Sequence, residues 1–362
     1  MNTDPLLVRH AAGEYPVHVV PGLLATAGDL VNRYLPDRRL AVIADATVAS
    51  LYQTPFEKRV DLILTFPPGE ASKTRDEWAR LTDQLLTAGF GRDSGIVALG
   101  GGVTGDLAGF VAATYLRGVP FVQVPTTLLA MVDASVGGKT GVDTGAGKNL
   151  VGAFHQPAAV LADPRVLTTL SESDFRAGLA EAVKHALMTD ALHFAWLETN
   201  AASLAGREPD AVTALVRRSV AIKAAVVAED ERELGRRATL NAGHTVGHAL
   251  EQASGYRLSH GDAVALGLIA EARLAAEMGV AEPALADRVT ALLGALGLPT
   301  RLPQALPADL LSQALRRDKK NRGSQVRCAL AAAAGQPARD GAGWTTGVEM
   351  DRILAAIGGL AS

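Results

Sequence analysis

The chain has 362 residues, 48% of them hydrophobic and 20% charged, which is typical of soluble globular proteins and long enough for two domains. Its formal net charge of −3 gives no general attraction to nucleic acid or to an anionic membrane, so we expect neither as a partner. No apolar run approaches the ~20 residues that span a bilayer, and no signal-peptide pattern is present, so a cytoplasmic location is expected. The single cysteine, Cys328, excludes internal disulfides and is expected to lie in the core.

The first half of the chain alternates strand-like and helix-like segments. Four short runs of branched and apolar residues are typical of buried strands, at 39–45, 61–66, 95–100 and 120–127. Two segments between them have helical spacing, at 72–89 and 105–118. The first has Ser72 as a candidate N-cap and Gly89 as a stop. This alternation predicts a largely parallel, Rossmann-like sheet with helices on both faces.

From about residue 170 onward, helical periodicity dominates and strand signals nearly vanish. Helices are expected at 171–188, 211–231, 260–279 and 283–297, and one short strand at 324–330. The polar stretch at 335–343 is expected to be a flexible loop. We therefore predict an α/β N-terminal domain over residues 1–168 and an α-helical C-terminal domain over residues 169–362.

A glycine-rich turn follows the predicted strand at 95–100. Gly100, Gly102 and Gly105 have G-x-G-x-x-G spacing and precede a helix, whose N-terminus favours a phosphate. An ordinary tight turn is the alternative interpretation. The next strand does not end in a ribose-binding acid, whereas Asp45 ends an earlier strand. We therefore predict a dinucleotide site of non-standard layout.

Four polar residues suggest a site on one helix face. On a continuous helix with about 100° per residue, Arg237, Asn241, His244 and His248 would lie within about 60° of one another. Buried polar groups need partners, so this stripe indicates a functional site, with a solvated helix face as the alternative. A helix that begins at Gly243 would instead take Arg237 and Asn241 off the stripe.

Glu181 and Lys184 lie three residues apart on the helix predicted at 171–188. One interpretation is an exposed ion pair, which contributes little to stability. The other is a metal-binding carboxylate beside a catalytic cation. One glutamate and two histidines form a normal catalytic zinc set with an open position. Spacing alone favours His244 and His248, four residues apart, as the histidine pair.

Two further segments carry several cations. A glycine-rich loop at 133–149 suits phosphate or carboxylate recognition, with a flexible solvated loop as the alternative. The polar residues of this loop include Asp133, Lys139, Lys148 and Asn149. The basic run at 316–323 is expected to be a solvated face.

Eight longer motifs follow one another between about residues 65 and 330. They are GEASK, ALGGGVTGDLAGFVAATYLRG, QVPTTLLAMVDASVGGKTGV, GKNLVGAFHQP, GLAEAVKHALM, LNAGHTVGHALE, SHGDAVALG and RDKKNRG. In this order they resemble the 3-dehydroquinate synthase family. The resemblance implies a homodimer whose chains have an α/β NAD domain, an α-helical metal domain and an active site between the two.

The resemblance also implies roles for individual residues, and its metal ligands differ from the pair that spacing favours. The divalent metal, zinc or cobalt, is held by Glu181, His244 and His260. The phosphate contacts are Lys139, Asn149, His248 and one of Lys319 and Lys320, and the carboxylate contacts are Lys223 and Arg237. Asp133, Lys184, Glu233 and Asn241 complete the substrate shell, and Arg117 reaches the phosphate site of the partner subunit. The catalytic group comprises Lys139, Lys184, Lys223, Arg237, Asn241 and His248.

The NAD contacts implied by the resemblance lie in the first domain and at its end. They are Asp45, Gly69, Glu70, Lys73, Gly102, Val103, Gly105, Asp106, Thr126, Thr127, Lys139, Lys148, Thr168 and Thr169.

The implied reaction converts 3-deoxy-D-arabino-heptulosonate 7-phosphate to 3-dehydroquinate and phosphate, in the shikimate pathway to chorismate and the aromatic amino acids. It runs through transient oxidation by NAD, phosphate elimination, re-reduction, ring opening and aldol closure, which makes the enzyme a carbon–oxygen lyase. Three alternatives stay open: a sister sugar-phosphate cyclase, a metal- and NAD-dependent polyol dehydrogenase and a non-catalytic binding protein. Arg237, Asn241 and His248 together favour a carboxylated substrate over that of a sister cyclase.

Overall fold

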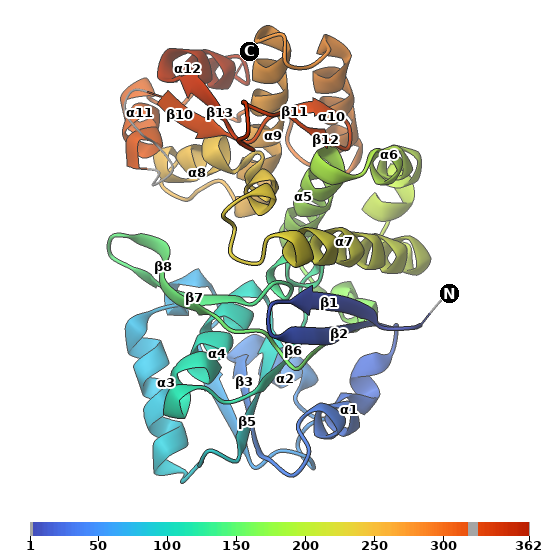
Figure 1. Cartoon of the computed structure of the whole chain (residues 1–362), viewed down its shortest axis with the longest axis vertical. Coiled ribbons are helices and arrows are strands. Elements are labelled where there is room, and N and C mark those ends of the chain that lie inside the picture. Colours follow the sequence, from blue (N-terminus) through green and yellow to red (C-terminus); the bar gives the residue numbers. More distant parts are fainter. Residues whose placement is uncertain (1–2, 318–324, 362) are drawn as a thin grey trace. The chain divides into compact units, whose positions relative to one another are not determined.

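A computed structural model describes residues 3–317 and 325–361 of the chain (Figure 1). Its residues group into two compact units. The first comprises Met1–Leu170 with Lys223–Ala228, and the second comprises Ser171–Ile222 with Glu229–Ser362. The first is an α/β unit with a mainly parallel sheet and the second is mainly helical, so the predicted fold class is confirmed.

A seven-stranded sheet forms the centre of the first unit (Figure 1). Its strand order is β1 (Leu6–His10), β2 (Gly13–Val19), β9 (Ala159–Ala162), β6 (Phe121–Pro125), β5 (Ser94–Gly100), β3 (Arg39–Asp45) and β4 (Leu62–Phe66). All neighbouring pairs are parallel except the β1–β2 hairpin. The chain leaves β3 toward β4 on one side and continues with β5 on the other. The carboxyl ends of β3 and β5 therefore flank a topological switch point, where such sheets bind ligands.

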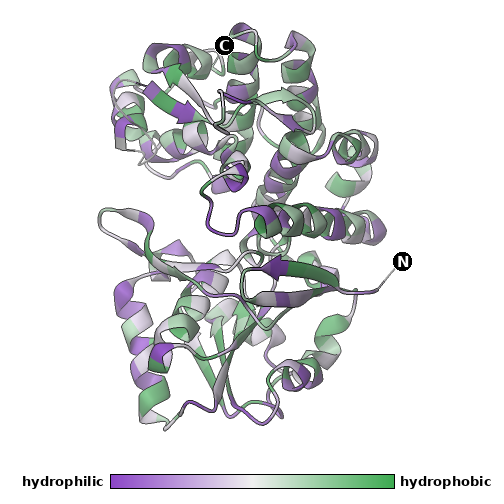
Figure 2. Ribbon diagram, viewed as in Figure 1, coloured by the Kyte–Doolittle hydropathy of each residue, from purple (hydrophilic) through white to green (hydrophobic). Residues whose placement is uncertain are grey.

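The apolar runs form strands because both faces of the central strands are covered. Every residue of β5 and β6 is buried, and Figure 2 shows hydrophobic residues concentrated on the strands of this sheet. The helices of this unit are α1 (Ala27–Tyr34), α2 (Ala46–Tyr52), α3 (Arg75–Thr87) and α4 (Gly102–Thr114). Helix α4 is apolar on nearly all sides and packs against β3, β5 and β6, as expected for a buried helix.

Two predicted helices of this unit have different ends in the structure. Helix α3 begins after Thr74, whose hydroxyl accepts the Glu77 N–H at 3.1 Å, so Ser72 is not its N-cap. The chain before it makes a short 3₁₀ turn, Glu70–Ser72. Helix α4 ends at Thr114, earlier than predicted, because the buried Tyr115 hydroxyl donates to the Phe90 carbonyl at 2.7 Å and holds the chain in a turn.

The glycine-rich segment 133–149 is not the flexible loop that was one interpretation of its sequence. It contains β7 (Lys139–Thr144) and the start of β8 (Gly147–Phe154), which pair as an antiparallel hairpin. Gly141 and Gly152 face each other across it. A Cβ on Gly152 would stand 2.1 Å from the Thr140 carbonyl oxygen, so the close pairing requires glycine there. The expectation of a loop is therefore wrong.

The second unit is built around α9. Its helices are α5 (Glu172–Thr189), α6 (Ala191–Ala205), most of α7 (Pro209–Glu229), α8 (His244–Ala253), α9 (His260–Glu277), α10 (Pro283–Ala295), α11 (Ala308–Arg317) and α12 (Met350–Gly358). Helix α9 packs against α5, α8, α10 and α12, and α11 packs against α8. The sequence did not predict α6, α11 or α12. In the described ranges, no helix has both the length and the apolar character that a membrane span needs.

Short strands occur near the end of the second unit, where the sequence predicted one. They are β10 (Gln325–Cys328) paired with β13 (Thr346–Glu349), and β11 (Ala331–Ala333) paired with β12 (Gln336–Pro337). The polar stretch 335–343 therefore holds a strand as well as turns. Cys328 is fully buried in β10, which confirms its expected place in the core.

Candidate metal centre and nucleotide-binding edge

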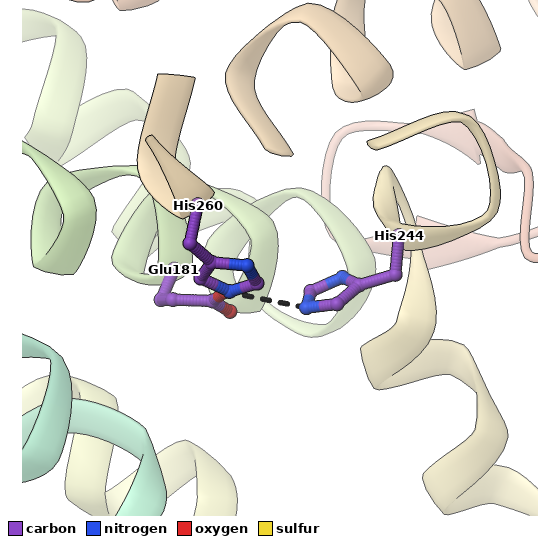
Figure 3. Close-up of side chains that lie close together, drawn as sticks. All are labelled: Glu181, His244 and His260. Atoms are coloured by element: carbon purple, nitrogen blue, oxygen red, sulfur yellow. Dashed lines mark hydrogen bonds and ion pairs between the residues drawn. The ribbon is translucent and has the colours of Figure 1, made fainter. Parts of the chain in front are cut away.

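Three separate elements of the second unit bring Glu181, His244 and His260 together (Figure 3). Glu181 lies in the middle of α5, whereas each histidine is the first residue of its helix. The Oε1 atom of Glu181 lies 3.3 Å from Nε2 of His244 and 3.2 Å from Nε2 of His260. The three side chains thus point at one another, and their ligand atoms all lie within 4.8 Å.

Both histidines have their other ring nitrogen engaged. His244 Nδ1 lies 3.1 Å from the Ala242 carbonyl oxygen, and His260 Nδ1 lies 3.0 Å from Oε1 of Glu251. A carbonyl or carboxylate oxygen can only accept, so both Nδ1 atoms carry a proton. When each ring is neutral, its Nε2 is left as the lone-pair donor that faces Glu181.

Lys184 forms an ion pair with the other oxygen of Glu181. Both side chains are 2% exposed, so the interpretation of these residues as an exposed ion pair is wrong. Burial alone would raise the pKa of Glu181, but Lys184 and His244 hold that pKa well below its usual range. The carboxylate is therefore ionised and available to a cation.

The chemistry of this donor set fits one divalent ion. One carboxylate oxygen and two imidazole nitrogens suit zinc or cobalt and leave a coordination position open. Burial opposes protonation of His260, but hydrogen bonds to Glu181 and Glu251 raise its pKa to about 9. A proton thus occupies the place of the cation in the metal-free centre, and a bound cation would displace it.

His248 lies next to this group but outside it. Its exposed ring lies 5.4 Å from the ring of His244 and 6.3 Å from that of His260, centre to centre. His248, Glu251 and His260 form a second group that is compact enough for an ion. Within the described part of this unit, no such group contains both His244 and His248, the pair that spacing alone favoured.

The predicted polar stripe does not form one helix face. Arg237 and Asn241 lie in a 3₁₀ turn, Arg236–Asn241, and α8 starts afresh at His244 because Gly243 adopts a left-handed conformation with φ of 75°. Gly243 also lies so close to α9 that a Cβ would stand 2.9 Å from the Val264 carbonyl oxygen. The prediction of one continuous helix is therefore wrong, and the alternative, a helix that begins near Gly243, is confirmed.

The residues before this turn form a polar loop. Asp230 accepts backbone N–H groups of Leu234, Gly235 and Arg237 at 2.8–2.9 Å, which fixes the loop around it. Arg237 is 2% exposed, and its guanidinium donates to the Glu231 carbonyl.

Asn241 closes the other side of the same loop. Its side-chain amide donates to Glu233 Oε1 at 2.5 Å, and Glu233 has a positive φ of 59°. Strained backbone of this kind clusters at functional sites.

Other predicted substrate residues lie in the first unit. The amine of Lys223, 6% exposed, donates to the backbone carbonyl and the carboxylate of Asp133. Arg117 and Asn149 both have positive φ, 74° and 54°, and both are exposed. Lys139 and Lys148 are exposed on β7 and β8. Lys319 and Lys320 lie outside the described residues.

The predicted cofactor residues follow the carboxyl ends of the parallel strands in the first unit. Asp45 ends β3, Gly69 and Glu70 follow β4, Gly102, Val103, Gly105 and Asp106 follow β5, Thr126 and Thr127 follow β6, and Thr168 and Thr169 follow β9. Carboxyl ends of neighbouring parallel strands share one edge of the sheet, and two of these ends flank the switch point. Asp45 also caps α2 by accepting the Val48 N–H at 2.9 Å.

A buried lysine organises one part of this edge. Lys73, 4% exposed, lies 2.8 Å from Glu70 Oε1, 3.3 Å from Asp106 Oδ2 and 3.7 Å from Asp143 Oδ1. Burial raises the pKa of Asp106 to about 6, against the opposing effect of Lys73. Sequence reasoning missed Asp143, which also accepts the Asn149 N–H at 2.8 Å. Its position 37 residues after Asp106 gives no local signal of this contact.

The glycine turn fits a dinucleotide. Gly101, the N-cap of α4, offers no side chain to the first N–H groups of that helix, which leaves them for an anion. A Cβ on Gly102 would meet no atom closer than 3.5 Å, so there is room beside this backbone. Next to the turn, the buried hydroxyl oxygen of Thr126 has no hydrogen-bond partner among the residues that the structure describes. An orphaned group at this edge is what a missing ligand would satisfy.

Two family models match the chain in succession. The first describes the N-terminal part of 3-dehydroquinate synthase and matches residues 63–177, and the second describes its C-terminal part and matches residues 178–321. A protein of Symbiobacterium thermophilum named 3-dehydroquinate synthase is 49% identical over 84% of this chain and 88% of its own length. One of the same name from Rhodospirillum rubrum is 45% identical over 93% of this chain and 91% of its own.

Solved structures of other sugar-phosphate cyclases share the fold. A 2-deoxy-scyllo-inosose synthase, in complex with carbaglucose-6-phosphate, NAD⁺ and Co²⁺, has a TM-score of 0.90 and 27% identity, over 98% of this chain and 99% of its own. The 2-epi-5-epi-valiolone synthase of Streptomyces hygroscopicus subsp. jinggangensis, with NAD⁺ and Zn²⁺, has a TM-score of 0.84 and 32% identity, over 96% of both chains. Glycerol dehydrogenase of Schizosaccharomyces pombe, at 14% identity and a TM-score of 0.68, shares the fold alone. Since relatives named 3-dehydroquinate synthase are 45–49% identical over most of the chain and two successive family models of the same name match it, this chain belongs to the 3-dehydroquinate synthase family.

Proposed function

We propose that the chain is a 3-dehydroquinate synthase, a lyase that converts 3-deoxy-D-arabino-heptulosonate 7-phosphate to 3-dehydroquinate and phosphate in the shikimate pathway. The observation that carries this proposal is the 45–49% identity to relatives of that name over most of the chain. The two sister cyclases, at 27% and 32% identity, are more distant. The converging donors Glu181, His244 and His260 favour an enzyme over a binding protein, because an open metal position serves chemistry.

The proposed cofactors are NAD at the strand-end edge of the first unit and one zinc or cobalt ion on Glu181, His244 and His260. When bound, NAD supplies reversible hydride transfer and the ion supplies a Lewis acid for substrate oxygens. The glycine turn, the orphaned Thr126 hydroxyl and the donor set support this assignment. The bound NAD⁺ with Co²⁺ or Zn²⁺ in the two cyclase structures supports it as well.

In the second unit, the proposed roles follow from charge and burial. Lys184 keeps Glu181 ionised and in place for the cation. Arg237 offers a planar guanidinium suited to the substrate carboxylate, and the Asp230 loop holds its backbone. Asn241 and Glu233 orient each other beside it and offer hydrogen bonds to substrate hydroxyls. The exposed His248 contacts the substrate phosphate.

In the first unit, Lys223 and Asp133 act as a pair. Asp133 positions the lysine amine, which contacts the substrate carboxylate. The phosphate contacts are Lys139 and Asn149, joined by one of Lys319 and Lys320. The substrate phosphate is the natural acceptor of the proton that elimination releases, so these residues need only hold it in place.

We further propose a cytoplasmic homodimer in which Arg117 contacts the phosphate in the partner subunit. Its exposed side chain and strained backbone support a functional role. Hybrid dimers of Arg117→Ala and Lys184→Ala chains should recover part of the activity that each variant lacks, because one site per hybrid is then intact. No recovery despite demonstrated subunit exchange would exclude action across the interface.

Product stoichiometry tests the proposed reaction. The purified protein, supplied with the heptulosonate phosphate, catalytic NAD and Zn²⁺ or Co²⁺, should release one phosphate per substrate consumed and no net NADH. NADH formed one for one with product, without phosphate, would instead support the polyol dehydrogenase. No turnover of this substrate, with turnover of another sugar phosphate, would support a sister cyclase.

A further inference from the structure

The two helices that carry the candidate histidine ligands resemble each other in one respect. Helix α8 begins at His244 and contains a buried glutamate seven residues later, Glu251. Helix α9 begins at His260 and contains a buried glutamate eleven residues later, Glu271. At about 100° per residue, both spacings place the glutamate within about 20° of the histidine on the same helix face. These two carboxylates are 4% and 3% exposed and are not explained by the proposed reaction.

Glu251 of α8 acts on the first residue of α9. Its Oε1 accepts the Nδ1 proton of His260 at 3.0 Å, while the other ring nitrogen faces Glu181 at 3.2 Å. This contact fixes both the tautomer and the rotation of the ring. A carboxylate partner also makes the opposite nitrogen a stronger electron donor.

Glu271 of α9 acts on the first turn of α8. Its two oxygens accept the backbone N–H groups of Gly243 at 2.7 Å and Val246 at 3.4 Å, on either side of His244. Gly243 is the N-cap of α8 and has no side chain to do this, whereas α9 has its own cap in Ser259, which accepts the Asp262 N–H at 3.2 Å. Close packing adds to the constraint, because a Cβ on Gly267 of α9 would stand 2.0 Å from the Gly243 carbonyl oxygen.

We propose that Glu251 and Glu271 are reciprocal positioning residues, through which each of the two helices fixes the histidine ligand of the other. The inference rests on the proposed metal set of Glu181, His244 and His260. Each histidine sits at a helix start, where the backbone frays most easily, and each receives its constraint from a buried residue of the neighbouring helix. The centre is thereby held in place before any cation binds.

Zinc affinity of the full-length protein, measured by competition with a chromophoric chelator, tests the proposal. Glu251→Gln keeps an accepting oxygen but loses the charge, so the zinc dissociation constant should rise about 10-fold. Glu251→Leu removes the acceptor and should raise it about 100-fold. Glu271→Gln should raise it about 10-fold, since only one of two N–H groups keeps an accepting oxygen. Unchanged affinity in all three variants would overturn the proposal.

Which of the two Glu251 variants binds zinc more tightly distinguishes a positioning role from a packing role. If Glu251 only filled space, leucine would serve as well as a buried glutamine or better, and that order of affinities would overturn its role. Glu198→Gln is the matched control, because it removes a charge from a structural ion pair in which both Glu198 oxygens contact Arg288, at 2.7–2.8 Å, on other helices. This variant should lose stability and keep the zinc affinity of the wild type.

Nuclear magnetic resonance of ¹⁵N-histidine protein loaded with zinc gives a second readout, which does not need the leucine variant to fold. The Nδ1 proton of His260 should move upfield in Glu251→Gln, while that of His244, bonded to the Ala242 carbonyl, stays in place. An unmoved His260 proton would overturn the contact. Loss of zinc from both Glu251→Gln and His248→Ala would make Glu251 a ligand, which also overturns it. A wild-type protein that binds no zinc would overturn the proposed metal set itself, and the inference with it.

Discussion

The candidate sites of the two units are assembled in different ways. In the first unit, the glycine turn occupies a few consecutive residues between β5 and α4, and most of its features are backbone features. In the second unit, Glu181 and His260 are 79 residues apart, and the candidate ligand atoms all belong to side chains. A local backbone site needs only one strand–turn–helix unit to form, whereas the metal centre exists only when α5, α8 and α9 are packed.

The two sites also handle buried charge differently. Lys73 in the first unit is one cation among three carboxylates, and in the second unit Glu181 is one carboxylate among a lysine and two histidines. In each case the surplus partners are available to a ligand. The first arrangement offers carboxylates to ligand hydroxyl groups, and the second offers nitrogen lone pairs to a cation once its protons leave.

The largest expected effect separates His244 and His248, which lie four residues apart on α8. His244→Ala should lower zinc affinity by a factor of about 10³ or more, because it removes one of three ligands, and turnover should vanish with the metal. His248→Ala should keep the metal within about threefold and lose turnover about 10²-fold, the usual effect of losing a polar substrate contact. Metal analysis and steady-state kinetics measure both.

A metal-free His248→Ala protein would contradict this assignment. It would favour the group of His248, Glu251 and His260, which joins α8 to the start of α9, or the spacing-based pair within α8.

The sequence predicted the sheet better than the candidate metal centre, because strands have a local sequence pattern whereas the centre depends on helix packing. Strands β3, β5 and β6 are continuous apolar runs bounded by turns, so their positions could be predicted from the residues, and their alternation with helices predicted a parallel sheet. Helices α11 and α12 were missed, although both are amphipathic. Strands β1 and β9, of five and four residues, were missed.

The proposed metal ligands could not be derived from spacing. Residues four apart, such as His244 and His248, lie on one helix face, and spacing therefore favoured them. The structure instead shows His244 beside residues of α5 and α9, an arrangement that depends on close packing at Gly243 and Gly267. The resemblance to a family supplied this set. Neither spacing nor the resemblance indicated Glu251, Glu271 or Asp143, because only their contacts in the folded chain reveal their roles.

A second prediction concerns His193, a buried histidine of the second unit. His193 of α6 is fully buried, and neither ring nitrogen has a hydrogen-bond partner among residues 3–317 and 325–361. Burial, with help from Arg218, lowers its pKa from 6.5 to about 4, whereas carboxylates raise that of His260. The unfolded chain therefore binds more protons than the folded one between pH 6.5 and 4. The stability that the neutral His193 contributes is fully present above pH 6.5 and is lost as the pH falls through about 4.

His193→Leu should therefore flatten the pH dependence of unfolding. In metal-free protein, the free energy of unfolding of the wild type should fall by about 3 kcal/mol more than that of the variant between pH 7 and 4. Denaturant titrations at several pH values measure this. Leu197→Ala, a buried apolar change on the same helix, is the control and should lower stability by about 2–5 kcal/mol at every pH. If the free energies of unfolding of wild type and His193→Leu changed in parallel with pH, the pKa of His193 would not be lowered by burial as expected.

The smallest expected effect tests whether the first site is made of backbone. A Cβ on Gly102 would meet Ala134 and Leu129 at 3.5 and 3.6 Å, ordinary contact distances, and this residue lies in the first turn of α4. Gly102→Ala should therefore leave the free energy of unfolding within about 1 kcal/mol of the wild type, since alanine favours the helix. It should raise the NAD dissociation constant about 10-fold, because the methyl group stands where the dinucleotide backbone approaches.

Gly100→Ala provides the contrast within the same turn. Its Cβ would stand 2.2 Å from the Thr104 hydroxyl, so this variant should lose about 1–3 kcal/mol of stability as well as NAD affinity. Gly358→Ala, at the end of α12 with no atom within 4 Å, should change neither quantity by much. Isothermal titration with NAD and denaturant unfolding separate the outcomes. If Gly102→Ala bound NAD as the wild type does, close approach at this backbone would not be needed. NAD binding in the first unit would then depend on side chains such as Lys73, just as the candidate metal centre depends on side chains.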